Sequence, residues 1–170
     1  MVGGCGTPPD DTDRTKADTQ FDENKSLFAA IQDAGQLDLY EGLPHQFFDP
    51  KQVEEEKQRK QTVTLHGFPF YATPLEVSED DAAKLRGLLA DERSFMQWRG
   101  EKKCGGFHPD YLAEFRVGKS VYRFLICFGC NEIMVFGPDR SLRCDFQGAG
   151  QQLAELLMKY RKNRPAGRGE

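Results

Sequence analysis

The stretch "YLAEFRVGKSVYRFLICF", residues 111–128, has the pattern of a β-hairpin and decides the fold. In its first half, apolar residues alternate with Glu114 and Arg116, which is the period of a strand that buries one face. Apolar residues also alternate along the second half, and Gly118 and Lys119 separate the two halves. Two residues are enough for a tight turn between antiparallel strands, so we expect the two halves to pair.

The short turn also predicts the register of this hairpin. If Val117 pairs with Ser120, then Asp110 faces Cys127 at the other end of the two strands. The start of the first strand therefore meets the end of the second. The segments at these ends, "CGGFHPD" before the first strand and "CFGC" after the second, are then neighbours in space although they are distant in sequence.

Further strands and helices are expected on both sides of this hairpin. Two β-rich stretches flank the turn "GPDR" and predict a second hairpin, and a third such stretch covers residues 62–77. Helical patterns occur at residues 23–35, 50–61, 78–95 and 153–160. Strands that follow one another and are flanked by helices are typical of the α+β class. We therefore expect a single α+β domain, with an antiparallel β-meander packed against helices.

The composition divides the chain into one domain and two polar ends. With 170 residues and 38% hydrophobic residues, the chain can build one core. Residues 1–20 are polar, charged and Pro-containing, which predicts a disordered tether, and residues 163–170 predict a basic flexible tail. The α+β domain then spans residues 21–162. The net charge of −4 argues against nucleic acid as a partner.

The predicted hairpin gathers four Cys and His residues at one end of the sheet. They are Cys104, His108, Cys127 and Cys130, with the spacing C-x3-H-x18-C-x2-C. Thiolates and a neutral imidazole suit a tetrahedral zinc ion, and the C-x2-C spacing lets one turn present two sulfurs. The sequence therefore names zinc as a candidate cofactor, with these four residues as its ligands.

Three other chemistries fit the same residues. Cys104 can form a structural disulfide with Cys127 or Cys130. The C-x2-C pair can be a redox motif, although it follows a strand instead of opening a helix. A cysteine of the cluster can be a nucleophile with His108 as its base, although no known catalytic motif surrounds it. The fourth of these cysteines, Cys144, shares a face of the second hairpin with Leu142 and Phe146, which predicts a buried free thiol.

The first residues, "MVGGCG", are similar to the end of a bacterial lipoprotein signal. In such a signal, small residues precede a cysteine that receives the lipid. By that resemblance Cys5 is the lipidation site, and the membrane is reached only through its lipid. The alternative is a cytoplasmic N-terminus with an incidental cysteine. The compartment matters because an oxidising one favours disulfides, whereas a reducing one favours metal binding or catalysis.

A wider resemblance rests on "KKCGGFHPDYLAEF", on "YRFLICFGCNE" and on the later "YRKNRP". These segments resemble a group of uncharacterised bacterial proteins that are often envelope-associated or lipoprotein-like and share such a hairpin segment. The resemblance covers roughly the last seventy residues of the chain. It implies the hairpin and a bacterial envelope origin, and it implies no activity.

These observations predict a non-catalytic bacterial envelope protein, lipid-anchored or secreted, with a structural Cys/His cluster. The alternative is a zinc-binding or thiol-redox protein that uses the same cluster, with a cytoplasmic location. The sequence does not identify the partner, which is expected to be a protein or a small molecule.

Overall fold

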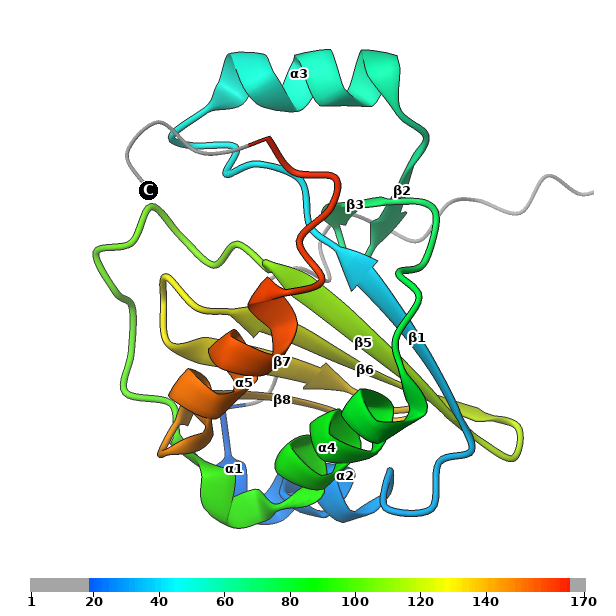
Figure 1. Cartoon of the computed structure of the whole chain (residues 1–170). Helices are drawn as coiled ribbons and strands as arrows, with labels where there is room; N and C mark the ends of the chain where they lie inside the picture. Colours follow the sequence, from blue (N-terminus) through cyan, green and yellow to red (C-terminus); the bar gives the residue numbers. More distant parts are fainter. Residues whose placement is uncertain (1–18, 166–170) are drawn as a thin grey trace, which may run out of the picture.

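A six-stranded antiparallel sheet forms the centre of the molecule (Figure 1). In this computed structural model, which describes residues 19–165, the strand order is β1-β5-β6-β7-β8-β4. The strands are β1 (Gln36–Glu41), β4 (Phe95–Gln97), β5 (Tyr111–Val117), β6 (Ser120–Cys127), β7 (Glu132–Phe136) and β8 (Ser141–Phe146). Strands β5 to β8 form the predicted meander, and β1 and β4 add one edge strand each. The predicted α+β class is confirmed.

The central hairpin has the register that its turn predicts. Val117 pairs with Ser120 and Tyr111 pairs with Ile126, and Gly118 has a φ of 59°, which glycine adopts at little cost. One residue before Tyr111, the backbone N–H of Asp110 donates to the carbonyl of Ile126 at 2.7 Å. The two strand ends therefore meet as expected, and they define the end of the sheet where the candidate site lies.

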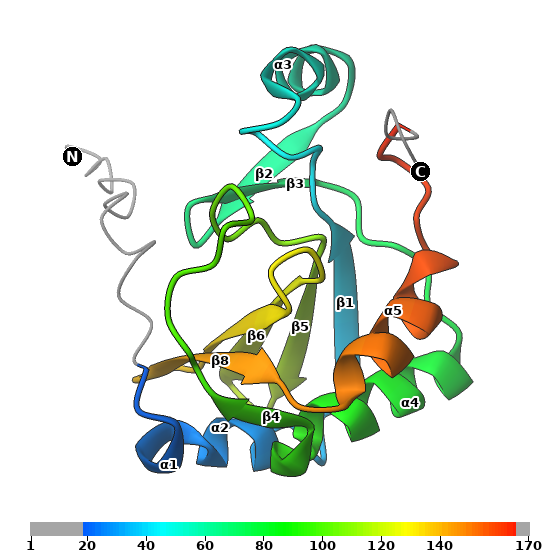
Figure 2. The ribbon, with the colours of Figure 1, turned by 90° about the vertical axis from the view of Figure 1, so that its left-hand side faces the viewer.

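Helices cover one face of the sheet and enclose the main core. They are α1 (Phe21–Asn24), α2 (Ser26–Ala29), α4 (Glu79–Ala90) and α5 (Ala149–Met158), and the short 3-10 helix η2 (Glu92–Ser94) leads from α4 into β4. Figures 1 and 2 show α4 and α5 lying together against the sheet, beside α1 and α2. Phe28, Leu89 and Leu153 are fully buried in this core. The helix expected at 23–35 is present as two single turns, α1 and α2.

The opposite face carries a smaller layer. Strands β2 (Thr62–Leu65) and β3 (Phe68–Tyr71) pair with each other, and helix α3 (Pro50–Arg59) lies at the end of the molecule away from α1 and α2 (Figure 2). Phe70 of β3 packs on Leu112 and Leu125 from the sheet, and all three are fully buried. The molecule therefore has a helical layer, a central sheet and a partial third layer made by the hairpin.

Candidate functional site

A disulfide joins the loop before β5 to the turn after β6. Cys104 and Cys130 are bonded, their Cα atoms are 5.7 Å apart, and they are separated by 26 positions in the sequence. Gly105 and Gly106 have φ angles of 78° and 93°, so the loop uses a backbone conformation that favours glycine. The convergence of the two segments is confirmed. Of the two disulfide partners that the sequence left open for Cys104, the structure has Cys130 and not Cys127.

The loop that carries Cys104 is also held by a buried charge network. Lys102 Nζ lies 2.7 Å from a carboxylate oxygen of Glu132 and 2.6 Å from one of Asp145. Arg143 pairs with Glu132 at 2.8 Å, and Glu132 is fully buried. Two cations thus compensate two carboxylates that would be costly to bury alone. The disulfide and this network together fix the position of the loop.

Cys127 is a free thiol that lies beside the disulfide. Its side chain is buried, and its sulfur accepts the backbone N–H of Cys130 at 3.3 Å. Burial raises the pKa of the Cys127 thiol to about 11, so the thiol is protonated at neutral pH.

The predicted buried free thiol at Cys144 is confirmed, and Cys144 lies opposite Ile133 in the second hairpin.

His108 is buried behind the disulfide and is neutral. Its side chain is 8% exposed, and burial together with the charge of Arg164 lowers the pKa of the ring to about 4. Nε2 lies 3.5 Å from a guanidinium nitrogen of Arg164. A guanidinium can only donate hydrogen bonds, so Nε2 is the unprotonated nitrogen of the ring. The ring of His45 lies beside it, with 4.5 Å between the centroids and an angle of 34° between the ring planes.

The four residues predicted to bind zinc are close in space but hold different partners. Cys104 and Cys130 are bonded to each other, and Nε2 of His108 faces Arg164. Within residues 19–165, no three His, Cys, Asp or Glu side chains form a group that could hold a metal ion. Zinc at these positions stays a prediction for a reduced cluster. Cys5 lies outside the residues that the structure describes, and its lipidation also stays a prediction.

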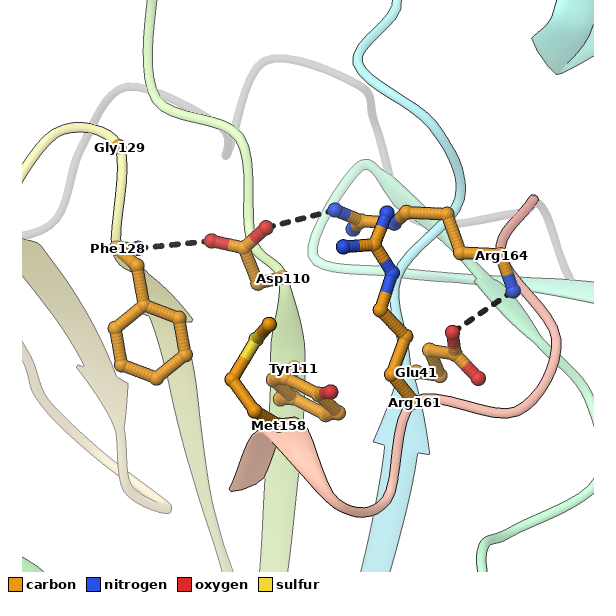
Figure 3. A pocket seen from close by; sticks show the side chains of 8 residues that line it. All are labelled: Glu41, Asp110, Tyr111, Phe128, Gly129, Met158, Arg161 and Arg164. Atoms are coloured by element: carbon orange, nitrogen blue, oxygen red, sulfur yellow. Dashed lines mark hydrogen bonds and ion pairs between the residues drawn. The ribbon is translucent and has the colours of Figure 1, made fainter. Parts of the chain in front are cut away.

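The segment after α5 is latched to the same end of the sheet (Figure 3). The carboxylate of Glu41, which is 1% exposed, accepts the backbone N–H groups of Lys162, Asn163 and Arg164 at 3.1, 2.7 and 2.8 Å. Arg164 in turn pairs with Asp110 at 2.8 Å. The sequence predicts that the domain ends at residue 162, whereas these contacts hold the chain in place through Arg164. A buried carboxylate that meets three backbone donors explains the difference, because it orders a segment whose composition favours a tail.

The contacts of Glu41 with the segment after α5 require a close approach between the end of β1 and the start of β5. The N–H of Gly42 donates to the carbonyl of Asp110 at 2.8 Å. A Cβ atom at Gly42 would lie only 2.1 Å from the carbonyl oxygen of Pro109. The end of β1 and the start of β5 can therefore meet only because position 42 has no side chain. The contact places Glu41 where it reaches the segment after α5.

A surface hollow lies beside the loop that carries Cys104. Its volume is about 380 Å³, and its lining includes His45, Phe47, Phe68 and Phe107. Phe47 is 70% exposed, which is unusual for a side chain of this size. The segment "FPFY" contributes Phe68 to this hollow, whereas Phe70 from the same segment is fully buried. The hollow is mainly aromatic, and the disulfide loop forms one wall of it.

Comparisons with known proteins add no identification. No family model, no curated protein and no solved structure matches this chain.

Proposed function

We propose that this protein is a non-catalytic protein of the bacterial cell envelope and that its Cys/His cluster is structural. The observation that carries the proposal is the Cys104–Cys130 disulfide. Disulfides form and persist in oxidising compartments such as the cell envelope and are rare in the cytosol. The bond closes the loop before β5 onto the end of β6, where it holds the wall of a surface hollow.

The state of Cys127 supports a structural role over thiol chemistry. A thiol acts as a nucleophile in its thiolate form, and redox motifs lower the thiol pKa by placing it at a helix N-terminus. Cys127 instead ends strand β6, and its pKa is raised to about 11. Its burial also keeps it away from a partner disulfide. These features favour a packed thiol beside a structural bond.

Attachment to the membrane is assigned to a lipid on Cys5. None of the helices within residues 19–165 is long and apolar enough to cross a membrane. The similarity of "MVGGCG" to a lipoprotein signal supports a lipid at Cys5, with residues 6–20 as the tether. The domain would then work at the membrane surface with a protein or small-molecule partner. The net charge of −4 disfavours nucleic acid as that partner.

Mass spectrometry of the native protein extracted from membranes tests this proposal. We expect a chain that begins at Cys5 and carries a lipid mass. The Cys5→Ser variant is expected to move to the soluble fraction, whereas Thr15→Ser, a change of similar size in the same predicted tether, stays with the membranes. An unmodified Cys5 that is still preceded by Met1 would contradict the lipid anchor, and recovery of the protein from the cytoplasm would contradict the envelope location.

A zinc-binding or thiol-redox protein is the second candidate. It is favoured by the closeness of the C-x2-C residues, since the sulfur of Cys127 accepts the N–H of Cys130 at 3.3 Å. Backbone N–H groups that point at a C-x2-C sulfur also stabilise a thiolate, and zinc binds the thiolate form. In a reducing compartment Cys104 and Cys130 would be thiols, and His108 would have to exchange Arg164 for the metal. About one zinc ion per chain in the purified protein would favour this candidate.

A further inference from the structure

Strand β2 is an open edge of the third layer. Its partner β3 is bonded on both sides, because β3 pairs with β2 and the carbonyl of Pro69 also accepts the backbone N–H of Leu43 at 3.3 Å. A bridge between Gly42 and Phe70 belongs to the same contact with the chain after β1. On its far side, β2 pairs with no other strand within residues 19–165. One edge of this hairpin is therefore free for pairing.

The register shows which backbone groups of β2 point away from β3. Just before β2, the N–H of Ala72 donates to the carbonyl of Gln61 at 3.0 Å, so these two residues form a bonded pair. Bonded and non-bonded pairs alternate along an antiparallel ladder, so Thr62 and Thr64 stand in non-bonded pairs. Pro69, which faces Thr64, agrees with this pattern because it has no N–H. The N–H and C=O groups of Thr62 and Thr64 therefore point away from β3.

The outward edge of β2 keeps these groups unprotected. No hydrogen bond joins the backbone of Thr62 or Thr64 to another group within residues 19–165, and both residues are exposed. Proteins commonly protect an edge strand with charged residues or with proline. The four residues of β2, Thr-Val-Thr-Leu, include neither, and Thr and Val favour strands. The edge therefore presents the row of donors and acceptors that an extended chain recognises.

A second copy of β2 fits this edge in one register. When Thr62 faces Thr64 of the second copy, Thr64 faces Thr62 of that copy, and Val63 faces its own equivalent across a two-fold axis. All outward groups of both strands then form hydrogen bonds. When Thr62 or Thr64 instead faces its own equivalent, the other threonine of each copy meets a residue outside β2. The free edge is therefore complementary to itself.

The side chains agree with this arrangement. Thr opposite Thr is a favourable cross-strand pair, and the β-branched Val63 would meet its equivalent on the other face of the sheet. β2 itself carries no charge, so no like charges face each other within it. Lys60, the charged residue directly before β2, is already paired with Glu56 at 3.0 Å. Charge repulsion therefore does not oppose pairing of the two strands.

We propose that β2 binds β2 of a second copy of this chain in an antiparallel pair, with Thr62 opposite Thr64 of that copy. The two hairpins then form one continuous sheet. A second strand satisfies every outward group at once, whereas a lipid or a small molecule offers no such row of donors and acceptors. This interface does not depend on the proposed envelope location or on the cysteine cluster.

Hydrogen exchange and sedimentation of the full chain at rising concentration test this proposal. In the dilute monomer, β3 should protect the amides of Val63 and Leu65, whereas those of Thr62 and Thr64 should exchange fast. Between about 10 µM and 1 mM the chain should form a dimer, and exchange at Thr62 and Thr64 should slow about tenfold or more, because each N–H gains a partner. A chain that stays monomeric at about 1 mM would overturn the proposal. If an unrelated β-forming peptide then slows exchange at Thr62 and Thr64, the edge belongs to another protein.

Variants at Thr64 separate the outward N–H from the fold. Thr64→Pro removes an N–H that does not bond to β3, so it should keep the fold and raise the dissociation constant of the dimer about tenfold or more. Thr64→Val keeps the N–H and a similar shape, so its dissociation constant should change little. A dimer that is as stable in Thr64→Pro as in the wild type uses another surface and would contradict the proposal.

Two charge variants check the register without a proline. The double variant Thr62→Lys, Thr64→Lys and the double variant Thr62→Glu, Thr64→Glu should each be monomeric, because like charges would face each other. An equal mixture of the two should form a dimer, because each Lys would then face a Glu. Dimers of either double variant alone, or a mixture that stays monomeric, would show that β2 does not pair with β2.

Discussion

The Cys104→Ser variant is expected to have a free energy of unfolding that is about 3 to 4 kcal/mol lower than that of the wild type. The bond closes a loop across 26 positions, and a cross-link of this length reduces the entropy of the unfolded chain by about that amount. The loss is a large fraction of the stability of a domain of this size. Urea unfolding followed by the fluorescence of Trp98, without reductant, measures it.

The double variant Cys104→Ser, Cys130→Ser is the control for this result. If the bond is the cause, the double variant is about as unstable as the single one, and a reductant destabilises the wild type but neither variant. Cys130 is 2% exposed, so any further loss of stability in the double variant measures the packing cost of replacing Cys130 and not the loss of the bond. A Cys104→Ser variant as stable as the wild type would contradict a structural role for the disulfide.

Acid is expected to destabilise the protein by about 3 kcal/mol between pH 6.5 and pH 4 through His108 alone. The unfolded chain binds a proton at this ring below about pH 6.5, whereas the folded protein binds it only near pH 4. The contribution of His108 is therefore fully present above pH 6.5 and is lost as the pH falls to about 4. The physical cause is burial of the ring, with Arg164 and His45 nearby opposing a further positive charge and Asp110 favouring it.

Unfolding free energies of the wild type and the His108→Gln variant, measured across this pH range, test the prediction. Between pH 6.5 and pH 4, the free energy of unfolding should fall much less in the variant than in the wild type, whatever the stability of the variant at neutral pH. Burial also lowers the pKa of His45, so His45→Gln is a second comparison, from which we expect a smaller change. The pKa of the Asp81 carboxyl is lowered to about 2, so its effect on the free energy of unfolding falls below this pH range. The same decline in wild type and His108→Gln would contradict the assignment.

The sequence predicted the central hairpin and its register correctly because both depend on local features. Alternation along residues 111–128 shows which side chains share a face, and the two-residue turn at Gly118 and Lys119 leaves one register. The helical pattern that begins at residue 78 also depends on local features, since the Ser78 hydroxyl accepts the N–H of Asp81 and caps helix α4.

The edge strands were missed because their partners are distant. Strand β1 pairs with β5, whose residues lie 70 to 80 positions later, and nothing in "QLDLYE" reveals that partner. Phe95 continues the apolar pattern of α4, yet it lies in β4, where it pairs with Phe146. In both cases a tertiary contact overrides the local pattern, which is common for short strands.

The sequence predicted where the cysteine cluster lies, but it did not predict which cysteine bonds to Cys104. The hairpin register brings Cys104 near both Cys127 and Cys130, and only the path of the glycine loop selects one partner. The contacts of Glu41 and Arg164 were missed. In the sequence Glu41 is an ordinary charged residue, and Arg164 lies in a basic segment whose composition predicts a tail. Their only sequence signal is an isolated acidic residue directly before Gly42 at the end of an apolar alternation.

The most direct test of the structural disulfide is a thiol map and a zinc assay on one sample of untagged protein, purified without chelator or reductant. After denaturation, an alkylating reagent should label Cys127 and Cys144, and it should label Cys104 and Cys130 only after reduction, in protein that contains no zinc. Immediate labelling of Cys104 and Cys130, together with about one zinc ion per chain, would contradict the disulfide and establish the metal site in its place.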